Sequence, residues 1–283
     1  VVLQGAATDA EDGGLPAAAL SWQLDGAPAG SGPAVAVAGL APGAHTATLA
    51  ATDANNQTVT ATVSFTVAPL NTPVAAAFVL DGACQDDGYA AATALPLPAY
   101  AGGSRASVTV ARSDPYLWVC FTGLAAGTAA PGAFASVRID GDHSRDAVAQ
   151  ADDYAFLVGE DGAVNTLAGD GAGGFVAAAP GSLHAQVSAA DGLWNAELRI
   201  DKNWIGGWDH LAGLQLGHER WQFQGDDYRW PHGAAANSPQ SWGAVALGSQ
   251  PLLTELEPST AMAGAPVFIL TVAGSNFADG AAV

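Results

Sequence analysis

The sequence predicts an all-β protein built from antiparallel β-sandwiches in tandem. Short stretches in which apolar and polar residues alternate recur along the 283 residues, and 35 glycines and 16 prolines separate them at frequent turns. Hydrophobic residues make up 49% of the chain, which is enough to bury a core and too many for a disordered chain. A length of 283 residues suggests two domains or slightly more.

The charge balance narrows the classes of partner. With 27 acidic against 8 basic residues the net charge is −19, which argues against nucleic acid as a partner. No apolar run reaches the ~18 residues of a membrane span, and no basic and then apolar segment opens the chain. The scarcity of lysine beside abundant Asp, Thr, Asn and Gly is typical of exported bacterial surface proteins, so we expect an extracellular or cell-surface location.

Residues 1–68 are the first predicted domain. Through 58–67, threonine and serine alternate with valine, alanine and phenylalanine, the period-two pattern of a half-buried strand. Turn clusters at 11–14 and 25–26 bracket a strand in which Trp22 is placed like the core tryptophan of a sandwich. Four short sequence segments are distinctive: Ala7-Thr8-Asp9-Ala10-Glu11-Asp12-Gly13, Ser21-Trp22, Gly39-Leu40-Ala41-Pro42-Gly43-Ala44-His45-Thr46 and Ala51-Thr52-Asp53. They resemble bacterial immunoglobulin-like repeats of the PKD and cadherin-like kind. The resemblance starts within the early strands, so we expect an N-terminally truncated immunoglobulin-like domain.

Residues 69–73, with prolines at both ends, are expected to form a linker to a larger domain at 74–249. Apolar alternation recurs there in five stretches separated by turns: 107–111, 116–121, 135–139, 154–158 and 193–200. An antiparallel sandwich of some eight or more strands accounts for this pattern most simply.

The larger domain contains a series of distinctive sequence segments: Leu80-Asp81-Gly82-Ala83-Cys84 followed by Tyr89, Tyr116-Leu117-Trp118-Val119-Cys120-Phe121, Arg138-Ile139-Asp140-Gly141-Asp142, Asp152-Asp153-Tyr154, Leu193-Trp194-Asn195-Ala196-Glu197-Leu198-Arg199-Ile200 and Gly225-Asp226-Asp227-Tyr228-Arg229-Trp230-Pro231. These segments resemble the family 9-like carbohydrate-binding modules and their DOMON-like β-sandwich relatives. Their order and spacing fit over about 170 residues. The resemblance implies a non-catalytic module that binds a polysaccharide or glycan and commonly holds structural calcium.

Residues 250–283 are predicted to be a partial third domain. Leu256-Glu257-Pro258-Ser259-Thr260, Ala263-Gly264-Ala265-Pro266, Phe268-Ile269-Leu270-Thr271-Val272 and Gly274-Ser275-Asn276-Phe277 resemble the opening strands of an IPT/TIG domain. Two strands alone bury too little to be stable in water. We therefore expect either that the domain is incomplete or that another molecule supplies the missing strands, which would be self-association through this segment.

Five aspartates form a candidate calcium site. Asp140, Asp142 and Asp146 follow a strand, and Asp152 and Asp153 come soon after. Carboxylates that converge on a loop repel one another unless a hard cation neutralises them, and Ca²⁺ takes about six to eight oxygen ligands. The alternative is that an acidic protein simply has acidic loops, and the spacing is not that of an EF-hand.

Tryptophans crowd the stretch from 204 to 242 and form a candidate sugar platform. Indole rings stack on the C–H faces of sugars, whose hydroxyl groups need polar side chains at the rim. Trp208, beside two glycines, and Trp230, before a proline, are the predicted loop-borne stacking rings. The other predicted contacts are Asp227, Tyr228 and Arg229. The alternative is a core role, which we expect for Trp194 and Trp242.

The two cysteines, Cys84 and Cys120, by their number fit either one disulfide or two buried thiols. Both lie in sequence segments that match the first strands of the carbohydrate-binding modules, so the resemblance favours a Cys84–Cys120 disulfide. Closing such a loop stabilises a fold by roughly 3–4 kcal/mol in the chain-entropy model.

No catalytic motif was found: the sequence holds no HExxH, Cys/His zinc spacing, GxSxG elbow, P-loop or dinucleotide fingerprint. Glu197 alternates with Arg199 on a strand, which favours a surface pair over a glycosidase carboxylate. We therefore expect a non-catalytic, carbohydrate-binding segment of a secreted or surface protein. The alternatives are a purely structural subunit of an extracellular filament, sheath or adhesin, and an accessory region of a larger glycoside hydrolase.

Overall fold

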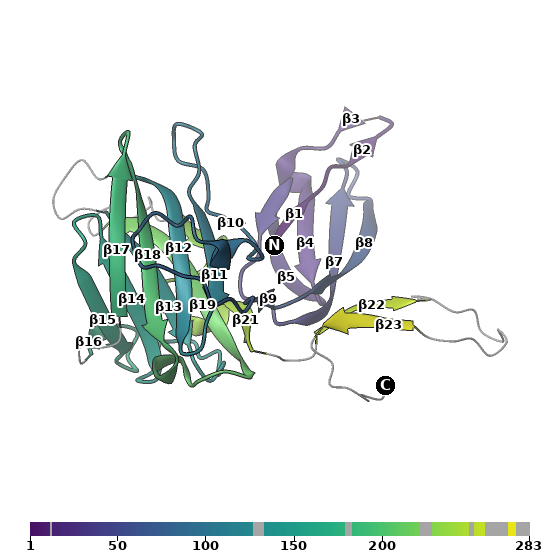
Figure 1. Ribbon diagram of the computed structural model, residues 1–283. Helices are drawn as coiled ribbons and strands as arrows, with labels where there is room; N and C mark the ends of the chain where they lie inside the picture. The colour runs from purple at the N-terminus through teal and green to yellow at the C-terminus, as the bar shows by residue number, and fades with distance from the viewer. Residues whose placement is uncertain are drawn as a thin grey trace.

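The protein is an all-β chain, as predicted (Figure 1). The computed structural model describes residues 1–11, 13–126, 133–178, 183–220, 228–248, 252–257 and 271–275. Within these ranges the helical elements are four short 3₁₀ turns: η1 (Ala17–Ala19), η2 (Asp87–Tyr89), η3 (Lys202–Ile205) and η4 (Pro239–Ser241). No helix in the described ranges is long and apolar enough to cross a membrane.

The N-terminal segment contains a four-stranded antiparallel sheet with a small core. The strand order is β5 (Ala27–Ser31), β4 (Leu20–Leu24), β7 (Gly43–Thr52) and β8 (Thr58–Val67). A two-stranded sheet of β1 (Val2–Gln4) and β6 (Ala34–Ala36) accompanies it, and β2 (Thr8–Asp9) pairs with β3 (Gly13–Gly14). Leu3, Trp22 and Ala47 form the buried centre, so Trp22 has the core position that the sequence predicted.

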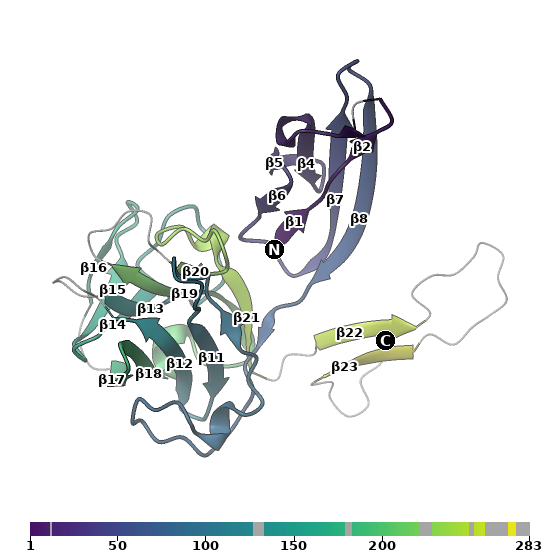
Figure 2. The ribbon, with the colours of Figure 1, turned by 90° about the horizontal axis from the view of Figure 1, so that it is seen from above.

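The larger unit is a sandwich of a five-stranded and an eight-stranded sheet (Figures 1 and 2). The five-stranded sheet has the order β10 (Leu95–Pro96), β11 (Ser107–Arg112), β12 (Tyr116–Ala125), β18 (Leu193–Asp201) and β17 (Leu183–Ala190). The second sheet has the order β16 (Phe175–Ala177), β15 (Val164–Gly169), β14 (Asp153–Gly159), β13 (Ala133–Asp140), β19 (His210–Arg220), β21 (Gly243–Leu247) and β9 (Leu70–Asn71), with β20 (Tyr228–Trp230) also paired to β19.

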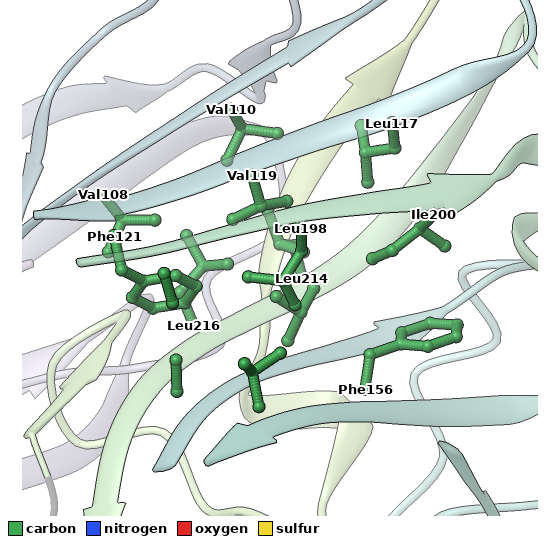
Figure 3. Packing of buried hydrophobic residues seen from close by; sticks show 14 of the residues in the cluster. Val108, Val110, Leu117, Val119, Phe121, Phe156, Leu198, Ile200, Leu214 and Leu216 are labelled. Carbon is green, nitrogen blue, oxygen red and sulfur yellow. The ribbon is translucent and has the colours of Figure 1, made fainter. Parts of the chain in front are cut away.

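The core lies between these two sheets (Figure 3). Alternate residues of β12 and β18, such as Val119, Phe121 and Leu198, meet Phe156 and Leu214 from the opposite sheet, and all five are fully buried. Trp194 and Trp242 are each 1% exposed, which is the core role expected of them.

The stretch 69–73 differs from the expected linker, because Leu70–Asn71 form the edge strand β9. It pairs in parallel with Val245 and Ala246 of β21, and the Thr72 hydroxyl donates to the carbonyl of Ala246 over 2.7 Å. Proline is tolerated beside a sheet edge, where no neighbour needs its missing N–H. The two-residue strand β9 can therefore pair with β21 although a proline lies close to each of its ends.

A disulfide joins Cys84 to Cys120 and holds the segment before β10 against the outer face of the five-stranded sheet. Phe78 stacks on Trp118 in the same layer, with ring centroids 4.7 Å apart. This layer is a second apolar cluster, separate from the core between the sheets.

Glu197 is buried beneath this layer, so the surface pair with Arg199 expected from alternation is wrong. Its carboxylate accepts hydrogen bonds from the backbone N–H groups of Asp81 and Gly82, each over 3.0 Å, and from the hydroxyl of Tyr89. Burial raises the pKa of Glu197. Alternation shows only that Glu197 faces away from the core, and here a distant part of the chain covers that face.

Replacing both cysteines with serine should destabilise the sandwich by about 3–4 kcal/mol, because the unfolded chain regains the freedom of a loop with a sequence separation of 36 residues. Denaturant unfolding of the wild type and the double variant measures this loss. Free-thiol titration of the unfolded, unreduced wild type should find none, and two reactive thiols would show that the pairing is wrong.

Beyond the sandwich, β22 (Leu252–Glu257) and β23 (Thr271–Ser275) form an antiparallel pair. The rest of 250–283 lies outside the described residues, so the IPT/TIG assignment and self-association through this segment stay predictions.

Candidate functional site

A pocket opens at one end of the sandwich, where β13 passes into β14 and η3 leads into β19. We call it the end pocket. Its volume is about 620 Å³. The lining residues are Gly141, Asp142, Asp152, Tyr154, Asn203, Trp204, Gly206, Trp208 and His210. The end pocket is lined by aromatic rings and by carboxylate, amide and imidazole groups. Trp208 lies there with Asp142 and Asp152, two of the predicted metal ligands.

The orientation of Trp204 is fixed by its contacts with the sandwich. It lies on η3, whose first turn is capped by the Asp201 carboxylate accepting the N–H of Asn203 over 2.9 Å. The indole meets Tyr154 edge to face, with ring centroids 4.8 Å apart. Such contacts fix the plane of a ring that remains half-exposed.

Trp208 is positioned by the loop that follows η3. Gly206 and Gly207 both have positive φ, at 76° and 90°, a conformation that side chains other than glycine disfavour. The Arg112 guanidinium lies 5.3 Å from the indole centroid, and the indole N–H is 3.4 Å from the Asp114 carboxylate. Trp208 is therefore a half-buried ring with one cation–π partner at the pocket wall.

The polar groups at the pocket are suited to hydroxyl ligands. Asp142, Asp152 and Asn203 are exposed and offer carboxylate and amide groups. His210 is half-buried, and its Nε2 has no hydrogen-bond partner among the described residues. Acceptors and a donor thus surround two indole rings, which is the composition expected of a sugar site.

Two of the predicted metal ligands, Asp140 and Asp153, lie directly opposite each other on β13 and β14 beside the pocket. Both are buried, with exposed fractions of 0% and 1%. Burial raises the pKa of Asp140 to about 6 and that of Asp153 to about 7. The neighbouring Asp142 carboxylate also raises the pKa of Asp140, so a proton can neutralise part of this cluster.

The full set of five aspartates does not form a ligand shell in the described parts of the chain, where no group of three His, Cys, Asp or Glu is arranged to hold a metal ion. The Asp140 carboxylate already accepts the N–H groups of Ser144 and Arg145, and Asp146 accepts the hydroxyl of Ser144. The donors are the oxygen type that calcium prefers, but their partners are mainly backbone and side-chain donors of the same loop.

The other predicted sugar contacts lie away from Trp208. Tyr228 faces the core, edge to face with Tyr100 at 4.5 Å, and Arg229 points to the opposite side of the sheet toward Glu219. Trp230 lines a separate cavity of about 470 Å³ between the N-terminal segment and the sandwich. Successive residues of β20 alternate in direction, which separates them. Asp227 lies outside the described residues.

The sequence did not reveal a buried polar network on the outer face of the eight-stranded sheet. Arg138 donates to Gln215 over 2.8 Å and forms an ion pair with Glu219, which also meets Arg229. Burial alone would raise the pKa of Glu219, but Arg138 and Arg229 hold it at about 2. A Cβ at Gly217 would approach the Ser136 hydroxyl to 2.7 Å, so glycine leaves room for the network.

Ser136 and Arg138 alternate with the apolar residues of β13, so both face away from the core. Their burial, with Ser136 at 0% and Arg138 at 6% exposed, depends on long-range packing, and the Phe175 ring lies 5.9 Å from the Arg138 guanidinium.

Comparisons with solved structures found matches of low sequence identity. One is a family 9 carbohydrate-binding module from Caldicellulosiruptor kristjanssonii in complex with cellotriose, with 12% identity, 69% of this chain and 100% of that chain covered, and a TM-score of 0.49. The module from the same organism in complex with glucose has 14% identity, coverage of 62% and 94%, and a TM-score of 0.49. A putative carbohydrate-binding protein from Bacteroides uniformis has 11% identity, coverage of 62% and 97%, and a TM-score of 0.43. No family model and no curated protein matches the chain.

Proposed function

We propose that this chain is a non-catalytic, carbohydrate-binding segment of an extracellular or surface protein, and that a sugar ring binds in the end pocket. The observation that carries the proposal is the pairing of Trp204 and Trp208 with the carboxylates of Asp142 and Asp152 in one open cavity. The resemblance of several sequence segments to family 9-like modules also supports a carbohydrate ligand.

In this arrangement the indoles contact the apolar face of the ring. Asp142, Asp152 and Asn203 accept or donate hydrogen bonds at its hydroxyl groups. Arg112 and Asp114 are positioning residues, because both contact the Trp208 indole. A half-buried aromatic with fixed orientation loses little conformational freedom on binding, which favours affinity.

Replacing Trp208 with alanine should weaken sugar binding by about 1–3 kcal/mol and leave the melting temperature nearly unchanged, because the ring contributes more to the ligand than to the core. A glycan array that includes glucose and cellotriose identifies the ligand, and calorimetry measures the loss.

Two control variants locate the site. Trp230→Ala should bind as the wild type does, because Trp230 lines the other cavity, and Phe175→Ala tests the face that bears the Arg138 network. Loss of binding in Phe175→Ala alone would move the site to that face. An array without any ligand would instead favour the structural alternative.

We also propose that calcium neutralises the acidic cluster beside the pocket. The support is the burial of Asp140 and Asp153 and the proximity of Asp142. Bound calcium would hold these carboxylates ionised and fix the loop that supplies Asp142 to the pocket.

The pH dependence of stability distinguishes neutralisation of Asp140 and Asp153 by protons from neutralisation by calcium. The folded pKa values of Asp140 and Asp153 lie above those of the unfolded chain, so without metal their contribution is present below about pH 4 and is lost as pH rises through 6–7. In EGTA, the melting temperature should therefore fall by a few degrees over this range. Added calcium should remove the fall, and identical melts with EGTA and calcium at pH 8 would exclude the calcium site.

A further inference from the structure

A second pocket opens on the outer face of the five-stranded sheet, where β11 passes into β12. We call it the side pocket. Its volume is about 610 Å³. The lining residues that matter here are Val74, Ser113, Asp114, Pro115, Tyr116 and Trp118.

The side pocket and the end pocket lie at the same end of the sandwich. Tyr116, the first residue of β12, pairs with Asp201, the last residue of β18, and η3 with Trp204 follows directly. The N–H of Lys202 donates to the carbonyl of Pro115 over 3.0 Å. Backbone contacts therefore hold the turn of the side pocket against the 3₁₀ turn of the end pocket.

Asp114 forms the boundary between the two pockets. It lines the side pocket, and its carboxylate lies 3.4 Å from the indole nitrogen of Trp208, which lines the end pocket. It also forms an ion pair with Lys202. Hydrogen bonds from Lys202 and Trp208 lower the pKa of Asp114, so its carboxylate is ionised at neutral pH and can accept further hydrogen bonds. The contact between the pockets thus runs through one exposed, polar side chain.

The side pocket also offers the apolar surface that the face of a sugar needs. Tyr116 is half-buried, with the Arg199 guanidinium 4.5 Å from its ring centroid and Trp118 edge to face at 6.3 Å. Val74, in the wall of the same pocket, is 65% exposed. A ring of fixed orientation beside the Asp114 carboxylate repeats, in smaller form, the combination of groups in the end pocket.

We propose that a glycan chain with one ring in the end pocket crosses Asp114 and places its next rings in the side pocket, so that the ligand is an oligosaccharide and not a single sugar. This inference rests on the proposed function of the end pocket. In this arrangement Tyr116 and Val74 contact the apolar face of the added ring, and Asp114 accepts hydrogen bonds from hydroxyl groups beside the glycosidic linkage. Because the added ring is already tethered, its contacts increase affinity without a second loss of translational freedom.

Calorimetry with sugars of increasing length tests the proposal. The probes are glucose, cellobiose and cellotriose, or the one-, two- and three-ring fragments of another glycan if the array identifies one. The three-ring probe should bind at least about tenfold more tightly than the single ring, with one molecule per chain.

Variants of Tyr116 locate the source of this gain. Tyr116→Ala should remove the gain and leave the affinity for the single ring unchanged, which also shows that the variant is folded. Tyr116→Leu keeps an apolar side chain against Trp118 but loses the flat ring, so it should give the same result. Tyr116→Phe keeps the ring, is the matched control, and should bind all three probes as the wild type does.

Equal affinities for the three probes would overturn the side pocket while leaving the end pocket in place. So would a full gain in both Tyr116→Ala and Tyr116→Leu. A gain that is lost in Phe175→Ala instead would place the added rings on the face of the Arg138 network. Absence of binding by every probe and every glycan on the array would overturn the proposed function itself, and the side pocket with it.

Discussion

Replacing Arg138 with methionine is expected to destabilise the sandwich by about 3–5 kcal/mol, because it leaves the buried Glu219 carboxylate without its main partner. Arg138 also donates to the Gln215 side chain, so the variant leaves a second buried polar group unpaired. Denaturant unfolding at neutral pH measures the effect.

The double variant Arg138→Met, Glu219→Leu is the control. It removes both charges, and buried ion pairs are often replaceable by apolar residues at little cost, so much of the loss should be recovered. A single variant as stable as the wild type would show that the network contributes nothing.

Because the pKa of Glu219 is lowered to about 2, its contribution to stability is present above about pH 4 and is lost as pH falls toward 2.

Replacing Glu197 with alanine should have the second large effect on stability. The change removes the carboxylate that accepts hydrogen bonds from three donors, which are the N–H groups of Asp81 and Gly82 and the hydroxyl of Tyr89. Each unpaired buried donor costs about 1–3 kcal/mol, so we expect a loss of several kcal/mol. Hydrogen exchange should show that the amides of 81 and 82 lose protection before the core strands do.

Two variants calibrate this result. Tyr89→Phe removes one hydrogen bond and should cost about 1 kcal/mol, while Glu197→Gln keeps one acceptor oxygen and should lie between the two. Protection of both amides in Glu197→Ala equal to that in the wild type would contradict the anchoring role.

Strand positions were the most predictable part of the fold. The alternation at 58–67 gave the bounds of β8, and that at 193–200 gave nearly all of β18, because a pleated strand imposes period two on any half-buried sequence. Period two reports which residues share a face. It does not report what lies on that face.

The errors follow from this limit. Glu197 faces outward as its position predicts, yet the segment held by the Cys84 disulfide covers it. In the same way, Trp208, Tyr228 and Trp230 are near in sequence, but strand direction and a glycine turn send them to three different surroundings. The strand positions of Tyr228 and Trp230 are set by pairing with His218 and Leu216, which lie ten and fourteen residues away and which local sequence does not show.

The central claim is that sugar binds at Trp204 and Trp208. The most direct measurement is the indole N–H signals of ¹⁵N-labelled protein in a titration with the glycan that the array identifies. We predict saturable shifts of the Trp204 and Trp208 signals, assigned with Trp→Phe variants, while the signals of buried Trp194 and Trp242 stay in place. Unchanged Trp204 and Trp208 signals at saturating glycan would contradict the claim.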